Sequence, residues 1–162
     1  MSKKNSELIE QLFALEEKTE LFPPPSSLEE IKLFEQIFGF NFPSLLVEIL
    51  LRANGGDFSF GRFDKTPFIT NDLLLLSPEQ AWVEYLSYLS MPDVIHPLIT
   101  ERKIFPLVYD YGTGYSCLDL TSNDSEDMQI LYLGDYMGEE DLPEFEAVSF
   151  FEFVLKSVNS HK

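Results

Sequence analysis

The centre of the chain carries two apolar runs that are separated by turn-forming residues. Residues 105–120 read FPLVYDYGTGYSCLDL, with Asp110, Gly112 and Gly114 between the two runs. Two glycines within three residues permit positive φ where the chain reverses, and apolar residues such as Leu118 suit a buried, pleated surface. The pattern predicts a β-hairpin at the centre of a sheet, with Leu118 in the core.

Shorter apolar runs on both sides of the hairpin predict further strands. Residues 73–76 are four consecutive leucines, which suit a buried strand, and the phenylalanines within 58–63 predict a first strand. Residues 130–133 predict a third strand in the same meander as the hairpin. We expect loops at 90–103 and at 134–147. The sheet should therefore be mostly antiparallel.

Apolar residues at helical spacing predict helices around residues 6–17, 27–38, 43–53, 77–89 and 149–158. Three of these helices begin with a capping box, in which a serine is followed three residues later by Glu or Gln: Ser27 with Glu30, Ser77 with Gln80, and Ser149 with Glu152. The residues expected to face the core are Leu8, Ile9, Leu12 and Phe13; Leu28, Ile31, Phe34, Ile37 and Phe38; Leu45, Leu46, Ile49, Leu50 and Ala53; Ala81, Trp82, Tyr85, Leu86 and Leu89; and Phe150, Phe151, Val154, Leu155 and Val158.

The net charge narrows the classes of partner. The 162 residues include 28 Asp and Glu against 11 Lys and Arg, which gives a formal net charge of -17. A nucleic-acid binder needs a basic surface to neutralise phosphates, and an anionic membrane would repel this chain for the same reason. We therefore expect neither nucleic acid nor membrane as a partner. Solubility explains so much acid on its own, and complementarity to a basic protein is the more specific interpretation.

Length and cysteine content favour one domain in a reducing compartment. A chain of this length is enough for one domain with a real core. The lone Cys117 lies in an apolar run, where a small core residue is a better interpretation than a nucleophile. The N-terminus lacks an uninterrupted apolar leader segment, and no run of about 18 apolar residues occurs. A cytoplasmic location is expected.

Residues with catalytic chemistry are few. Of the two histidines, His96 lies in a predicted loop and His161 lies beside the C-terminus, and neither has motif spacing to Cys117. The sequence GTG at 112–114 lacks the third glycine and the helix of a phosphate-binding loop, and the acidic turn at 119–130 lacks the glycine and terminal glutamate of a calcium loop. We expect a protein that is not an enzyme and has no cofactor or metal.

Four stretches in order resemble the SUKH superfamily, which includes the fungal cell-wall-synthesis regulator family and many bacterial immunity proteins. They are IKLFEQIFGFNFPSLLVEILLRANGG, FPLVYDYGTGYSCLDL, the strand ILYLGD and the closing helix VSFFEFVLKSV. We interpret each position on the family pattern as a structural residue, in a turn or a helix cap. These positions are Pro43, Asn54, Gly55, Gly56, Gly112, Gly114, Asp119, Ser149 and Phe150. The sequence departs from the pattern at Tyr115, where family members often have an acidic residue.

The resemblance implies an α+β fold with a mostly antiparallel sheet, a central hairpin, N-terminal helices, one mid-chain helix and a C-terminal helix. Residues 1–162 would form a single SUKH-like domain, with an N-terminal helix and Pro-rich connector at 1–25 and the core at 26–158. It also implies an immunity protein that neutralises a bacterial toxin, often a nuclease, by binding it. A regulatory protein–protein interaction scaffold and a small-molecule-binding domain, with the aromatic segment 58–63 lining a pocket, remain alternatives. The oligomeric state is left open between a monomer and a weak dimer.

Acidic residues and tyrosines alternate in the loops expected at one end of the sheet, where a basic toxin surface would be met. Tyrosine anchors that are surrounded by charge suit such an interface, although ordinary solvated loops have the same composition. The hypothesised partner-binding residues are Asp57, Asp110, Tyr111, Asp135, Tyr136, Glu139, Glu140 and Asp141.

Overall fold

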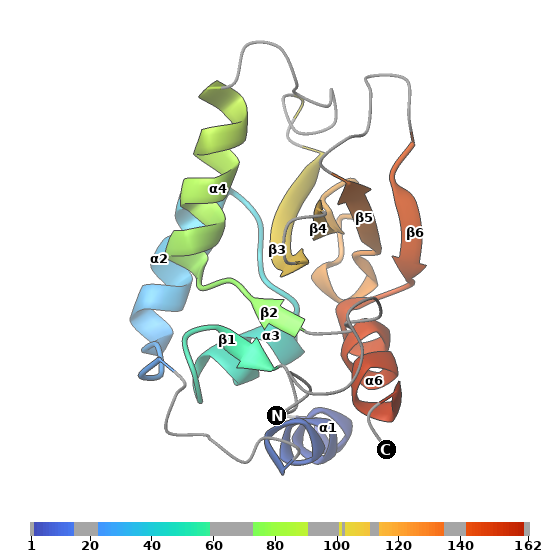
Figure 1. Ribbon diagram of the computed structural model, residues 1–162. Helices are drawn as coiled ribbons and strands as arrows, with labels where there is room; N and C mark the ends of the chain where they lie inside the picture. Colours follow the sequence, from blue (N-terminus) through green and yellow to red (C-terminus); the bar gives the residue numbers. More distant parts are fainter. Residues whose placement is uncertain are drawn as a thin grey trace.

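The structure is a computed structural model that describes residues 2–14, 23–58, 73–90, 101, 103–110, 114–134 and 142–160. These residues form an α+β fold with one six-stranded antiparallel sheet and surrounding helices (Figure 1). The elements in chain order are α1 (Lys3–Ala14), α2 (Leu28–Phe38), α3 (Ser44–Leu50), β1 (Gly56–Phe58), β2 (Leu73–Leu75), α4 (Pro78–Ser90), β3 (Ile104–Asp110), β4 (Gly114–Asp119), the 3-10 helix η2 (Ser125–Asp127), β5 (Ile130–Gly134), β6 (Glu144–Ala147) and α6 (Phe150–Ser160).

The hairpin of β3 and β4 lies at the centre of the sheet, as the sequence predicted. The strands follow one another in the order β1-β2-β3-β4-β5-β6, each antiparallel to its neighbour. Consecutive residues of β3 from Ile104 to Val108 are all buried, and so are the residues of β4 from Gly114 to Leu118. Because successive side chains of a strand point to opposite faces, both faces of the central hairpin are covered. The prediction that Leu118 lies in the core is confirmed, since none of its surface is exposed.

The helices form two groups around the sheet. Figure 1 shows α2 and α4 side by side along the left flank, whereas α1, α3 and α6 gather in the lower part of the view. Helix α1 contacts both α3 and α6, and α4 packs on β3. Phe38 joins α2 to the rest of the core, because its ring centroid lies 5.3 Å from that of Trp82 in α4 and 4.7 Å from that of Phe105 in β3. No helix in the described ranges is both long enough and apolar enough to cross a membrane.

A polar network connects α1 and η2 to the beginning of α3. The N-cap position of α3 is Pro43, which has no side-chain cap, and the carboxylate of Glu126 takes that role instead. Ser44 donates to it through its backbone N (2.6 Å) and its Oγ (3.0 Å). Buried Asn5 donates through Nδ2 to Ser44 Oγ (3.0 Å) and Glu48 Oε1 (3.1 Å). Exposed backbone donors at a helix N-terminus are thus satisfied by a carboxylate 82 residues away.

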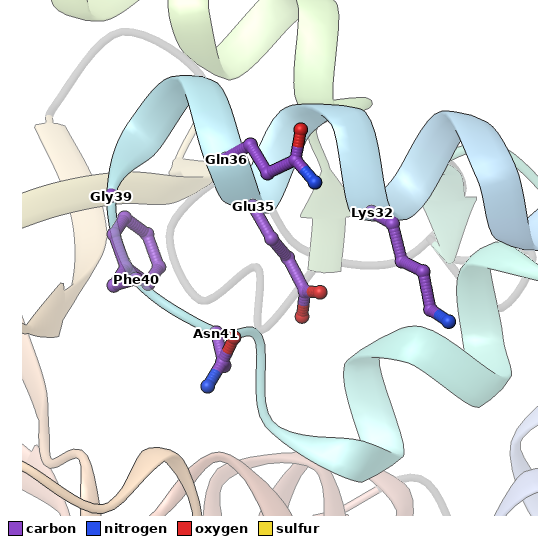
Figure 2. A pocket seen from close by; sticks show the side chains of 6 residues that line it. All are labelled: Lys32, Glu35, Gln36, Gly39, Phe40 and Asn41. Carbon is purple, nitrogen blue, oxygen red and sulfur yellow. The ribbon is translucent and has the colours of Figure 1, made fainter.

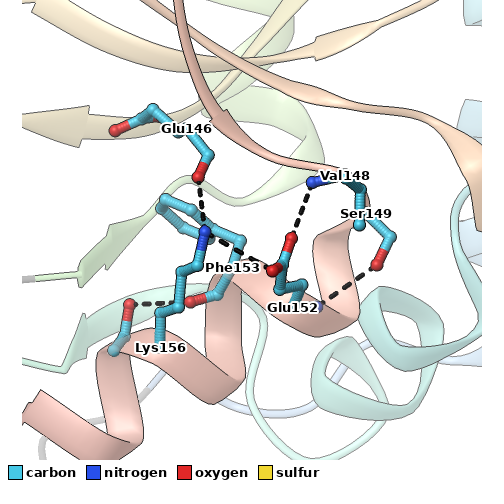
Figure 3. Close-up of polar contacts among 7 residues, drawn as sticks. Glu146, Val148, Ser149, Glu152, Phe153 and Lys156 are labelled. Carbon is cyan, nitrogen blue, oxygen red and sulfur yellow. Dashed lines mark hydrogen bonds and ion pairs between the residues drawn. The ribbon is translucent and has the colours of Figure 1, made fainter.

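The predicted capping boxes form, with one variation. Ser27 and Glu30 exchange both hydrogen bonds at the beginning of α2, and Ser77 and Gln80 do so before α4. At α6, Glu152 N donates to Ser149 Oγ, but the Glu152 carboxylate accepts from the backbone N of Val148, not of Ser149 (Figure 3). The same carboxylate lies 3.5 Å from Lys156 Nζ, which also donates to the carbonyl of Glu146 (2.9 Å). This arrangement joins the beginning of α6 to β6.

Some expectations from the sequence were wrong. Residues 144–147 form the edge strand β6 and not a loop, because they pair with β5 through Leu131↔Phe145 and Ile130↔Ala147. Leu28 and Ile37 of α2 and Leu86 and Leu89 of α4 were expected to face the core but are exposed. The first strand ends at Phe58 in the described part, and residues 59–63 lie outside the described residues, as do 15–17 of the expected first helix.

The apolar stripes expected on α1, α3 and α6 are buried for the most part, whereas Phe13, Phe151 and Leu155 are half-buried. Helix α3 buries Leu45, Leu46, Ile49 and Leu50, and Ala53 directly after it is buried as well. Leu8, Ile9 and Leu12 of α1 are buried among α3 and α6. In α6, the fully buried positions are Phe150, Val154 and Val158.

Candidate functional site

The hypothesised partner-binding residues fall on the ends of strands and on the connections between them. Asp57 lies in β1 and Asp110 is the last residue of β3. The other six hypothesised residues, Tyr111, Asp135, Tyr136, Glu139, Glu140 and Asp141, lie outside the described residues. The binding role of all eight stays a prediction.

Strand register brings the chain positions around these residues to one end of the sheet. Asp110 pairs with Gly114, and Gly114 pairs with Gly134, so β3, β4 and β5 are aligned there. Asp57 pairs with Leu74, which pairs with Tyr109, so β1 ends at the same end of the sheet. Because the strands alternate in direction, the chain leaves the sheet at this end after β1, β3 and β5. We call it the loop end.

A tyrosine pair and a required glycine stabilise the sheet at the loop end. The rings of Tyr109 and Tyr115 lie 5.1 Å apart across β3 and β4, and the Tyr115 hydroxyl donates to Glu84 Oε2 of α4 (3.0 Å). Gly114 has φ +154, and a Cβ on it would lie 2.2 Å from the carbonyl oxygen of Leu133. This glycine allows β4 and β5 to approach closely, and the Tyr115–Glu84 bond fixes α4 beside the loop end.

Two of the family-pattern positions, Gly55 and Asp119, have the turn roles expected of them. Gly55 has φ +81, and a Cβ on it would lie 2.7 Å from Leu75 O, so the Asn-Gly-Gly turn packs closely against the end of β2. Asp119 Oδ1 accepts from Thr121 N (2.9 Å) and Thr121 Oγ1 (2.7 Å), which fixes the turn after β4. Their geometry builds the sheet and its turns.

The described residues hold little that supports catalysis. Burial raises the pKa of the Cys117 thiol far above its usual range, and the charge of Glu146 raises it further, so the thiol stays protonated and weakly nucleophilic. In the described ranges, no three His, Cys, Asp or Glu side chains group together as a metal site would need. His96 and His161 lie outside these ranges.

A shallow polar depression lies beside the C-terminal half of α2. It has a volume of about 360 Å³ and is lined by Lys32, Glu35, Gln36, Gly39, Phe40 and Asn41. Figure 2 shows the Glu35 carboxylate below the helix, on the side of the loop that carries Asn41. That carboxylate accepts a hydrogen bond from the backbone N of Phe42 (2.8 Å), so it fixes the connection to α3. Among the described residues that line the depression, Lys32 is the one cation, and these residues offer no pair of groups set for acid–base chemistry.

An exposed apolar surface on α2 and α4 was not predicted from the sequence. Six large apolar side chains on α2 and α4 are exposed. One of them, Leu28, is the first residue of α2, and we call the other five the α2–α4 face: Leu33 54%, Ile37 49%, Val83 62%, Leu86 45% and Leu89 37%. A signal for it was present in the sequence. Leu33 and Val83 lie outside the apolar stripes expected for their helices, so apolar residues cover more of each helix than one packed face requires. Contiguous exposed apolar surface is a feature of protein interaction sites.

The comparison with known families agrees with the order of these elements. The family model described as the SMI1 / KNR4 family (SUKH-1) matches residues 25–156. This range contains all the described strands, the helices from α2 to η2 and most of α6, whereas α1 lies before it. No curated protein matches the chain. The matched range includes the Asn-Gly-Gly turn, the central hairpin and the Asp119 turn, whose geometry is given above. Since the match covers far more than half of the 162 residues, the chain belongs to the SMI1 / KNR4 family (SUKH-1).

Proposed function

We propose that this protein is an immunity protein, which binds a bacterial toxin with a basic surface and neutralises it by covering that surface. The proposal rests on one observation above all: a member of the SUKH-1 family carries a formal net charge of -17. A nuclease-type toxin needs a basic surface for its substrate, and a compact acidic protein can cover such a surface. The chain would act by occlusion, without catalysis and without a cofactor.

The loop end suits the first contact with such a toxin. Asp57 and Asp110 lie where β1 and β3 reach this end of the sheet. The connections that follow β3 and β5 contain the other six residues: Tyr111, Asp135, Tyr136, Glu139, Glu140 and Asp141. Long-range attraction between this acidic end and a basic surface would speed association. The Tyr115–Glu84 bond and the close approach at Gly114 give these connections a rigid base.

A neutralisation assay tests the proposal directly. The chain is titrated against the product of a toxin-like reading frame that lies immediately upstream of its gene, and the remaining toxin activity is measured. Occlusion predicts a linear loss of activity that ends at one chain per toxin. Loss at far lower ratios would point to catalysis, and no loss with any neighbouring toxin would favour a regulatory scaffold instead.

The association rate of that complex should depend steeply on salt. Raising the salt from 0.1 M to 1 M shortens the Debye length from about 10 Å to about 3 Å, so steering between exposed charges is lost. Charge reversal of Glu139, Glu140 and Asp141 together should slow association at low salt and leave the free energy of unfolding unchanged. Stopped-flow measurements with both proteins check this, and a rate that neither salt nor the triple variant alters would place the interface elsewhere.

A further inference from the structure

The residues of the α2–α4 face lie on two helices that meet through the rings of Phe38 and Trp82. Leu33 and Ile37 are four residues apart in α2, whereas Val83, Leu86 and Leu89 follow one another at intervals of three in α4, so each set lies along one side of its helix. Ile37 and Trp82 line the same small cavity of about 30 Å³, and the rings of Phe38 and Trp82 are in contact. The two sets therefore border one seam between the helices, which lie side by side in Figure 1.

Carboxylates border this face on both helices. Glu30 precedes Leu33 by three residues and Glu79 precedes Val83 by four, so each acid lies one turn before the exposed apolar residues on its helix. Hydrogen bonds from the backbone and side chain of Ser27 lower the pKa of Glu30, which keeps it ionised. Lys32, the cation of α2, lines the polar depression with Glu35 and Gln36 on another side of that helix (Figure 2). The border of the face is therefore acidic.

We propose that the α2–α4 face binds a protein segment that presents apolar side chains bordered by Lys and Arg. The proposal deepens the proposed function, since this segment would belong to the neutralised toxin. An amphipathic basic helix fits both features, because its apolar side would cover the five exposed residues and its cations would meet Glu30 and Glu79. A second copy of this chain fits worse, since it would bring two acidic borders and two net charges of -17 together.

The face lies where it could extend an interface at the loop end. Helix α4 carries three residues of the face, and its Glu84 accepts a hydrogen bond from the Tyr115 hydroxyl at the loop end. The loop end would then supply charge, which governs the rate of association, and the α2–α4 face would supply the apolar area, which slows dissociation.

The single tryptophan gives this face its own reporter. Trp82 is the only Trp of the chain, is half-buried, and lies beside Ile37 at the seam. The probe is a synthetic 14-residue amphipathic peptide of Leu and Lys, without aromatic residues, titrated into the full chain while the emission of Trp82 is recorded. We expect a saturable blue shift. Two comparison peptides, one with Glu in place of every Lys and one of Ser and Lys alone, should each bind at least about tenfold more weakly.

Paired variants decide whether the face itself binds. Leu33→Ser with Val83→Ser should weaken binding of the Leu/Lys peptide about tenfold or more, because both side chains are more than half exposed and belong to the face. The matched control is Leu142→Ser with Val148→Ser, which alters two side chains that are 83% and 56% exposed near β6, and it should change affinity less than twofold. Equal effects of the two pairs, or equal binding of the Ser/Lys peptide, would overturn the proposal.

Two further measurements separate this proposal from others. Sedimentation equilibrium tests the second copy: self-association that Leu33→Ser with Val83→Ser abolishes would mean that the chain itself occupies the face, and would overturn the proposal. Neutralisation by the same double variant separates it from the proposed function. Full neutralisation by the variant would refute a role of the face in toxin binding, while the proposed function would stand. Failure of the unaltered chain to neutralise would refute the proposed function. The peptide titration would then still show whether the face binds apolar basic segments.

Discussion

Helices α2 and α3 are both amphipathic and follow each other in the chain, yet they are buried to very different extents. Helix α3 buries four of its seven residues, Leu45, Leu46, Ile49 and Leu50. Among the eleven residues of α2, only Ile31 is buried to that degree, and Leu33 and Ile37 are about half exposed. The same kind of sequence pattern therefore leads to a core helix in one place and to a surface helix in the other.

The difference arises from the elements around each helix. Helix α3 is in contact with α1 and α6 and receives its N-terminal cap from Glu126 of η2. Helix α2 rests on the core through Phe38, which contacts Trp82 and Phe105, and no described element covers its outer side. An apolar stripe thus shows which residues can be buried, and the neighbours decide which of them are.

The sharpest test of this comparison uses the same substitution on both helices. Ile49→Ala should lower the free energy of unfolding by about 2 to 5 kcal/mol, because it removes buried methyl groups and leaves a cavity. Ile37→Ala should lower it by less than about 1 kcal/mol, because Ile37 is 49% exposed whereas Ile49 is fully buried. Urea unfolding of both variants measures the difference. Equal losses would mean that the outer side of α2 is covered in solution.

Two glycines extend the comparison to the backbone. Gly114 in the covered hairpin and Gly39 at the end of α2 both have positive φ, but a Cβ would clash with Leu133 O at Gly114 and would meet nothing within 4 Å at Gly39. We expect Gly114→Ala to cost about 2 to 4 kcal/mol from backbone strain plus displacement of β5. Gly39→Ala should cost only about 1 to 2 kcal/mol from the left-handed conformation. Thermal unfolding ranks the two, and a smaller loss for Gly114→Ala would contradict the register of β4 and β5.

The N-terminal caps of the same two helices differ in origin. Ser27→Ala removes the local cap of α2 and should cost about 1 kcal/mol. Glu126→Ala removes the distant cap of α3 and should cost a similar amount, roughly 0.5 to 2 kcal/mol. Chemical unfolding measures the loss of stability in both variants, and hydrogen exchange shows which helix is destabilised in each. Protection should fall at the first turn of α2 in the first variant and at the first turn of α3 in the second.

The smallest expected effect is a pH dependence at the beginning of α2. The pKa of Glu30 is lowered chiefly by the backbone hydrogen bond from Ser27, so its stabilising contribution is present above the unfolded-state pKa of 4.5 and is lost as pH falls through the lower folded-state pKa. The stability difference between the unaltered chain and Glu30→Gln should therefore be constant near neutral pH and shrink as the pH falls below about 4.5. A difference that grows in acid would contradict the direction of this shift.

Much of the local structure follows from the sequence alone. The hairpin at 105–120, the capping boxes of α2 and α4, and the buried stripe of α3 depend on residues within a few positions of one another, so their patterns are visible in the chain. The Asp119 turn belongs to the same class, since its carboxylate binds Thr121 two residues on. The acidic character of the protein is likewise a property of composition and needs no structure.

Only the tertiary structure decided which apolar residues stay exposed and which distant groups meet. Strand β6 gave no clear pattern, because Glu144 and Phe145 at the sheet edge are both exposed, and pairing with β5 creates the strand. The cap of α3 by Glu126 joins residues 82 positions apart, and no local rule relates them. The exposure of Ile37, Leu86 and Leu89 has the same origin: periodicity specifies the apolar side of a helix, but burial depends on which remote elements pack against that side.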